Sequence, residues 1–288
     1  MNYSQFELLL TAFLPSFILC IYVFIKDRTE KEPIPLLIGL LVSGAAFALP
    51  AYYATNAVIK LSNRLFDSYY ELNESGIATY VNTGSMVTHT FVTSLFSAIV
   101  VVIMIFIPVF LITFRNKNFN CLFDGVVYGT FTAYGFSICF NVMKSSEIGW
   151  NYVSGKAFST IPFFLLVGVY MGLLYTVWHK YSVAAKEEKR LSSLGKINIV
   201  KPFRSAKWLA LSIAVPIIVY CNFDFSGSVR ILNFKYFYFG FIAVTYVIAF
   251  IIIHKLSESD ATDGDITNAL IRKKYNIRET EEKGKNNE

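Results

Sequence analysis

Charged side chains are scarce in this 288-residue chain, since Asp, Glu, Lys and Arg make up only 16% of it, against about 25% in ordinary soluble domains. Hydrophobic residues make up 55% and aromatic residues 17%. A soluble globule needs a more polar surface, and a disordered chain needs low hydrophobicity, so the composition excludes both classes for most of the chain. The apolar residues fall in runs that can cross a bilayer, which takes about 20 residues per helix. We therefore expect an all-α, polytopic integral membrane helical bundle.

Cysteine and histidine are also scarce. The four cysteines stand in or beside apolar runs without CxxC spacing, which is typical of small buried side chains and not of a disulfide framework; they are Cys20, Cys121, Cys139 and Cys221. The three histidines, His89, His179 and His254, are spread along the chain, so we expect no metal cluster and no cofactor. The net charge of +6 comes from basic residues between apolar runs, which indicates membrane topology and no nucleic-acid partner.

Seven apolar segments predict about seven membrane-spanning helices. They cover Phe6–Ile25, Ile34–Ala54, Met86–Phe114, Leu122–Met143, Phe158–Trp178, Trp208–Phe225 and Phe234–His254. We expect one transmembrane domain over residues 1–256 and a charged, mobile tail over residues 257–288. Residues 56–84 are expected to form a polar external segment with an amphipathic interfacial helix, and Tyr181–Arg204 a basic cytoplasmic loop.

Lys and Arg residues are concentrated in alternate loops. Twenty of the 26 fall in the loops after the first, third and fifth spans and in the tail after the seventh. The positive-inside rule therefore puts the N-terminus outside and the C-terminus in the cytoplasm. The pair Glu187-Glu188 lies among basic neighbours and is expected on a solvated helix face.

Polar side chains within the spans are candidates for function, because placing them in a membrane is costly. They are His89, Asp124, Asn141, Asn222 and Asp224. Asp124 stands where a helix begins, and its carboxylate is expected to cap free backbone N–H groups there. Two pairs of glycines at a spacing of four predict close helix contacts; they are Gly125 with Gly129 and Gly168 with Gly172.

An ordered set of motifs resembles the PrsW family of bacterial intramembrane proteases, within the CPBP (CAAX-protease-like) superfamily. The strongest motif runs from Phe123 to Gly129 and continues through Tyr134-Gly135-Phe136 to Phe140-Asn141. Three others share its order along the chain: Lys26 to Pro33, Lys156-Ala157 leading to Gly168 and Gly172, and Tyr220 to Asp224. The resemblance covers about residues 10–225 and implies a helical bundle in the bacterial cytoplasmic (inner) membrane.

The resemblance also implies where the reaction site of the family would lie. Counting back from Asp124, the E-E-x-x-K motif of the family falls on Val101, Val102 and Ile105. The glutamate of its E-N pair falls on Phe140, and its two histidines fall on Phe164 and Tyr220. The retained polar motif residues are Asp124, Asn141 and Asp224.

These replaced positions are expected to meet in one chamber within the membrane. At about 1.5 Å rise per residue, Val101 lies near the middle of the bilayer, and Phe140, Phe164 and Tyr220 lie in its outer half. Peptide hydrolysis needs an activated water and a proton donor, which apolar side chains cannot supply. The leading hypothesis is therefore a catalytically inactive pseudoprotease that binds a membrane-protein partner of unknown identity within the lipid bilayer.

Two alternatives stay open from the sequence. The first is an active protease with a relocated site that uses Asp224, Asp124 or His89, which requires these groups to lie within hydrogen-bonding reach of one another. The second is a small transporter, channel or lipid-handling protein, which requires a continuous polar path across the membrane.

Overall fold

The computed structural model describes residues 5–27, 31–67, 70–72, 78–148, 160–199, 202–229, 235–258 and 262–275. Within these ranges the chain is all-α apart from one small hairpin. The helices are α1 (Gln5–Lys26), α2 (Ile34–Leu65), α3 (Thr83–Thr113), α4 (Asp124–Ile148), α6 (Thr160–Ser193), α7 (Ala206–Val229), α8 (Lys235–Glu258) and α9 (Asp263–Tyr275). The hairpin pairs β1 (Tyr70–Leu72) with β2 (Ala78–Tyr80), antiparallel.

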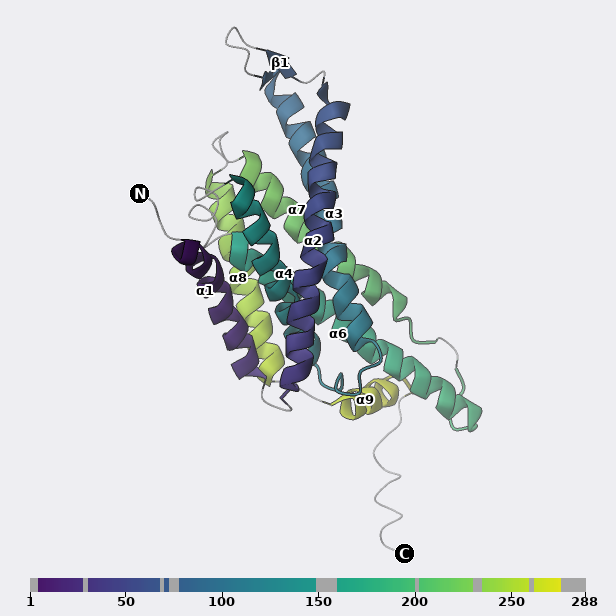
Figure 1. The fold of residues 1–288 in the computed structure, drawn as a ribbon. Helices are drawn as coiled ribbons and strands as arrows, with labels where there is room; N and C mark the ends of the chain where they lie inside the picture. The colour runs from purple at the N-terminus through teal and green to yellow at the C-terminus, as the bar shows by residue number, and fades with distance from the viewer. Residues whose placement is uncertain are drawn as a thin grey trace, which may run out of the picture.

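Six of these helices are long and apolar enough to cross a membrane: α2, α3, α4, α6, α7 and α8. The first predicted span, Phe6–Ile25, corresponds to α1, whose described apolar part, Ser16–Lys26, is shorter. The hairpin and α9 lie at opposite ends of the bundle (Figure 1). Helices α4 and α6 are the most deeply buried of the six spans, so the centre of the bundle is built around this pair.

Glycines let α4 pack directly against its neighbours. A Cβ atom added at Gly125 or Gly129 would lie 2.6 Å or 2.2 Å from the carbonyl oxygens of Gly172 and Gly168 on α6. On the other side of α4, a Cβ atom at Gly135 would lie 1.9 Å from the carbonyl oxygen of Leu41 on α2. Two helices can approach this closely only where side chains are absent, so the four glycines that the sequence indicated lie at the α4–α6 contact.

Two helices continue beyond their apolar runs. Helix α2 extends to Leu65, so the helix expected in the external segment is a continuation of the second span and not a separate interfacial element. Helix α6 extends to Ser193, through most of the predicted basic loop. Lys, Glu, Arg and Ala all favour helix, so the polar stretch after the apolar run continues the helix.

The segment expected to be a mobile tail contains a packed helix. In α9, Thr267 and Ile271 are buried on one face. Lys274 and Tyr275 both donate hydrogen bonds to the carboxylate of Glu188 on α6. The backbone N–H of Phe203 donates to the same carboxylate at 3.0 Å. Glu188 is therefore buried in an interhelical contact, and its predicted place on a solvated face is wrong; residues 276–288 lie outside the described residues.

Candidate functional site

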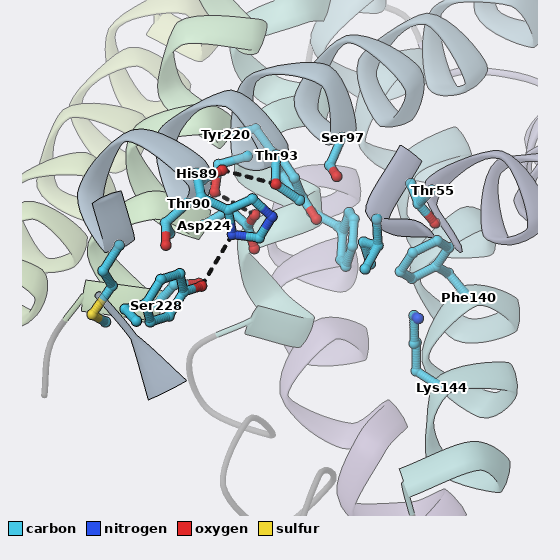
Figure 2. A pocket seen from close by; sticks show the side chains of 15 residues that line it. Thr55, His89, Thr90, Thr93, Ser97, Phe140, Lys144, Tyr220, Asp224 and Ser228 are labelled. Atoms are coloured by element: carbon cyan, nitrogen blue, oxygen red, sulfur yellow. Dashed lines mark hydrogen bonds between the residues drawn. The ribbon is translucent and has the colours of Figure 1, made fainter. Parts of the chain in front are cut away.

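A pocket of about 430 Å³ lies at the end of the bundle that carries the hairpin. It is lined by the hairpin and by the ends of five helices, α2, α3, α4, α6 and α7 (Figure 2). The lining residues are Thr55, Ile59, Tyr80, Met86, His89, Thr90, Thr93, Ser94, Ser97, Phe140, Lys144, Phe164, Tyr220, Asp224 and Ser228. Side chains from distant parts of the sequence therefore converge on one chamber.

One wall of the pocket is aromatic, and it consists of Phe140 on α4, Phe164 on α6 and Tyr220 on α7. The ring centroids of Phe140 and Phe164 lie 5.6 Å apart, and those of Phe164 and Tyr220 also lie 5.6 Å apart. All three side chains are nearly buried. The structure therefore brings together Phe140, Phe164 and Tyr220.

A second part of the lining is polar and comes mainly from α3 and α7, where Asp224 stands one helix turn after Tyr220. The hydroxyl of Ser94 donates to Oδ2 of Asp224 at 2.8 Å, and Ser94 is itself buried. The phenol of Tyr80 and Nδ1 of His89 lie 3.0 Å apart and share a hydrogen bond. Figure 2 shows Asp224 and His89 grouped on this side of the pocket.

A cationic side chain lies on the far side of the same pocket. Lys144 near the end of α4 donates to Oδ1 of Asn56 at 2.6 Å. Its ammonium also lies 4.9 Å from the ring centroid of Tyr52, a distance that suits a cation–π contact. Lys144 and Phe140 stand apart from Asp224 and His89 in Figure 2, so the pocket carries opposite charges on opposite sides.

The remaining replaced positions do not line the pocket. Val101, Val102 and Ile105 of α3 are fully buried in the apolar core. Ser97 is the pocket residue nearest to them in sequence, and Val101 lies about 6 Å farther along the helix, at 1.5 Å per residue. The expectation that these positions share the chamber is wrong, and so is the expectation of a wholly apolar chamber. The prediction took the number of residues between the α3 positions and Asp124 to be the same in this chain as in the family.

Four of the α3 residues that line the pocket were missed from the sequence, whereas His89 was named from it. Thr90, Thr93, Ser94 and Ser97 recur at the spacing of one helix face. A stripe of hydroxyl groups in an otherwise apolar span was a visible signal of a polar wall. Ser and Thr are common in membrane helices because they can bond to their own backbone, and this made the stripe easy to pass over.

Two retained motif residues lie away from the pocket. Asp124 is fully buried and accepts hydrogen bonds from the backbone N–H groups of Asn120 and Cys121, at 2.8 Å and 2.6 Å, in the loop before α4. Asn141 is buried on α4 and donates to the carbonyl oxygen of Ser137 at 2.6 Å. The carboxylate of Asp124 thus fixes the loop that enters α4.

The motif after α1 joins Asp124 at the end of the bundle far from the pocket. The hydroxyl of Tyr128 donates to Oε1 of Glu32 at 2.7 Å, which ties this motif to the first turns of α4. Asp27 and Glu32 are both buried there. Arg28 and Glu30 of the same motif, and Lys156-Ala157 of another, lie outside the described residues.

The donor set of the pocket does not fit a catalytic metal ion. A catalytic zinc site uses three protein ligands drawn from His, Cys, Asp and Glu. The lining residues supply two such groups, His89 and Asp224. Across the part of the chain that the structure describes, no group of three or more such residues could hold a metal ion. Helix α3 carries no acidic residue along its whole length, so no shift of register supplies the missing ligand from it.

Comparisons with known proteins agree on one family. The family described as PrsW family intramembrane metalloprotease matches residues 32–253. The Protease PrsW of Bacillus subtilis (strain 168) is 22% identical over 221 residues, which cover 77% of this chain and 83% of that protein. The Protease PrsW of Clostridioides difficile (strain 630) is 24% identical over 250 residues, which cover 85% of this chain and 87% of that protein. No solved structure matches the chain.

Proposed function

Because the chain belongs to the PrsW family of intramembrane metalloproteases, we propose that it is a catalytically inactive member, a pseudoprotease that binds a membrane partner without cleaving it. The observation that carries the proposal is the aromatic wall of the pocket. Phe140, Phe164 and Tyr220 stand where the family motifs have a glutamate and two histidines, and they contact one another there. The phenyl rings of Phe140 and Phe164 can neither ligate a metal ion nor take a proton from water.

The α3 wall supports the same proposal. In the family pattern the helix before the Asp-Gly motif carries two carboxylates and a lysine. In this chain α3 carries hydroxyl groups and His89 along the pocket. Water activation by an acid–base pair contributes factors of about 10²–10⁴, and metal-bound water adds more. Asp224 is the one carboxylate among the lining residues, and the hydroxyl of Ser94 holds it in place.

A membrane partner can pack against the lateral surface of the bundle. An apolar groove of about 240 Å³ lies between α1 and α2, and Phe131 and Tyr134 of α4 contribute to it. The sides of this groove carry Phe17 and Ile38, which are about half exposed. Another membrane helix could bury these side chains by van der Waals packing, which drives helix association in lipid. We place the protein in the bacterial cytoplasmic membrane, with its C-terminus in the cytoplasm.

The test is a cleavage assay with the purified full-length chain and a panel of single-span membrane substrates. The expected result is no cleavage above background, with or without added Zn²⁺, together with capture of a substrate by the intact protein. The Bacillus subtilis relative, assayed in parallel, serves as the positive control. Cleavage by this chain that disappears in the Asp224→Asn variant would overturn the proposal.

A second candidate function is an active protease with a relocated site. The observation that favours it is that Asp224 and His89 line the same pocket, so two of the three groups named from the sequence converge. Asp124, the third, lies at the other end of the bundle. This candidate expects cleavage that both Asp224→Asn and His89→Gln abolish, while Asn222→Ala, an exposed change on α7, leaves it unchanged.

The transporter alternative gains no support from the described interior. The residues of α3 beyond the pocket, Val101, Val102 and Ile105, are apolar and fully buried, as are Phe136 and Leu165 on α4 and α6. A transport path needs polar groups across the whole bilayer, and here the polar lining ends at the pocket.

A further inference from the structure

The pocket separates a negative group from a positive group. Asp224 on α7 and Lys144 on α4 both line it, and Figure 2 shows them on opposite sides, with Tyr220 beside Asp224 and Phe140 beside Lys144. Hydroxyl groups of Thr90, Thr93 and Ser97 lie along α3. A ligand that matches this arrangement carries a cation at one end and an anion at the other, with hydrogen-bonding atoms between them.

The aromatic wall adds to the recognition of a cation. Phe140, Phe164 and Tyr220 present rings to the pocket, and an ammonium group is attracted to ring faces within about 6 Å. A carboxylate beside aromatic rings is a common arrangement for binding an ammonium group, since the charge and the rings act together. The Asp224 side of the pocket therefore suits an alkylammonium group.

The pocket lies at the depth of lipid headgroups. Asp224 stands five residues before the end of α7 at Val229, and Lys144 stands four residues before the end of α4 at Ile148. At 1.5 Å per residue, both groups lie about 6–8 Å from the helix ends. The polar layer on each side of a bilayer is about 5–8 Å thick, so we expect the pocket to lie beside that layer and not at the centre of the membrane.

The rim of the pocket can accept acyl chains. Ile59 of α2 lines the pocket and is also exposed on the outside of the bundle. Phe91 and Phe96 on α3 are about half exposed, and they stand next in sequence to Thr90 and Ser97, which line the pocket. An amphipathic molecule arriving from the bilayer would thus meet an apolar rim and a polar interior.

We propose that this pocket binds the zwitterionic headgroup of an aminophospholipid, with its ammonium group at Asp224 and its phosphate at Lys144. The volume of about 430 Å³ is within the range of small-ligand pockets, about 300–1,000 Å³. The binding does not depend on whether the protein is active as a protease, so the two proposals succeed or fail separately.

The test is native mass spectrometry of the full-length protein in detergent, titrated with phosphatidylethanolamine or phosphatidylglycerol. The two lipids share the phosphate, and only the first has an ammonium group. We expect the wild-type protein to bind phosphatidylethanolamine about tenfold more strongly than phosphatidylglycerol. This is the size of effect expected from one charge-assisted hydrogen bond. Equal retention of the two lipids by the wild-type protein would overturn the proposal without recourse to any variant.

Charge-removing variants assign the two ends of the headgroup. Asp224→Asn is expected to remove the preference for phosphatidylethanolamine and to leave phosphatidylglycerol binding unchanged. Lys144→Gln is expected to weaken the binding of both lipids about tenfold, because a charge-assisted hydrogen bond to the phosphate is lost. The controls are Asp67→Asn and Lys60→Gln, which remove exposed charges outside the pocket on or just after α2, and these should match the wild type. An unchanged preference in a folded Asp224→Asn variant contradicts the assignment.

Competition with a soluble compound shows whether the ligand is a lipid or a water-soluble molecule with the same charged groups. O-phosphoethanolamine carries the headgroup charges without acyl chains. If the acyl chains contribute, millimolar O-phosphoethanolamine should leave bound phosphatidylethanolamine in place. Displacement at micromolar concentration would overturn the lipid assignment and point to a soluble phosphoamine as the ligand.

Discussion

At the scale of single residues, the chemistry of the pocket depends on three aromatic side chains. Phe140, Phe164 and Tyr220 belong to three helices that are far apart in the sequence, and their rings form a continuous contact. Each could be exchanged for a metal-binding side chain of smaller or similar size. Because the three side chains converge, metal-binding residues introduced at these positions would face one pocket, and this can be tested directly.

Restoring the three family residues should create a metal site. We expect the triple variant Phe140→Glu, Phe164→His and Tyr220→His to bind Co²⁺ and to show visible d–d absorption, because three ligands then face one pocket, as a catalytic-type site requires. The wild-type protein should show no such absorption. Cleavage of membrane substrates should still be absent, because α3 supplies no carboxylate.

The control for this variant moves one imidazole out of the pocket. Ile218 lies on the same helix as Tyr220, but it is 60% exposed on the outside of the bundle. Phe140→Glu and Phe164→His combined with Ile218→His should bind Co²⁺ at least tenfold more weakly than the triple variant. Equal absorption from the two would show that the three restored side chains do not act as one site.

Motifs in the sequence point to the aromatic residues of the pocket and to Asp224, whereas the α3 hydroxyl groups carry no motif. Phe140, Phe164 and Tyr220 were placed by motifs on their own helices, each at a short distance from a glycine or aspartate of the pattern. The α3 positions were placed by counting back through the loop before Asp124, and loop length varies freely between relatives. Ser94 and Ser97 carry no motif, so their helical spacing is the one signal in the sequence, and the packing of α3 against α7 shows which wall they form.

At the scale of helices, the α4–α6 contact should be the part least tolerant of added volume. Gly129→Ala would place a methyl group 2.2 Å from the carbonyl oxygen of Gly168, and the helices would have to separate. Overpacking of this kind costs about 1–3 kcal/mol. We expect the thermal unfolding midpoint of the protein in detergent to fall accordingly.

Two glycines elsewhere provide the matched control. A Cβ atom at Gly39 on α2 or at Gly240 on α8 would meet nothing within 4 Å. Alanine at these positions should leave stability unchanged or raise it by up to about 1 kcal/mol, the difference in helix propensity. If Gly129→Ala and Gly39→Ala behaved alike, the close α4–α6 approach would not limit stability.

The contact between α6 and α9 depends on one buried carboxylate. Glu188→Gln removes the charge that Lys274 and Tyr275 bind, and a hydrogen bond to a charged group is worth about 1.5–3 kcal/mol. We expect amide hydrogen exchange in residues 263–275 to accelerate at least tenfold. The neighbouring change Glu187→Gln removes only the exposed pair with Arg190, so exchange in α9 should stay at the wild-type rate. Equal acceleration in both variants would contradict the role of Glu188.

Helix positions followed from the sequence more closely than helix ends. Apolar runs placed all seven predicted spans on helices of the structure. The ends of α2 and α6 were misjudged, because an apolar run measures what a membrane can cover and not where the backbone stops being helical. Helix α9 was missed because two buried side chains, Thr267 and Ile271, give too weak an apolar signal in a charged segment.

At the scale of the whole molecule, the distribution of charge and the arrangement of the helices make one joint prediction. The hairpin and α9 lie at opposite ends of the bundle (Figure 1). Cys121 pairs with Thr262 just before α9 in an isolated β-bridge, so the loop between α3 and α4 lies at the α9 end. The excess of Lys and Arg in the tail and in alternate loops places this same end in the cytoplasm, and the pocket then opens toward the outer face.

Single cysteines test this orientation in intact cells. In a background whose four native cysteines are replaced by alanine, Asn118→Cys and Gly195→Cys should react with a membrane-impermeant maleimide only after the cells are opened. Asn63→Cys and Val81→Cys, at the hairpin end and exposed, should react in intact cells. The opposite labelling pattern would show that the protein has the inverted orientation in the membrane. The pocket would then face lipids of the cytoplasmic leaflet. Labelling of all four positions in intact cells would contradict a fixed orientation altogether.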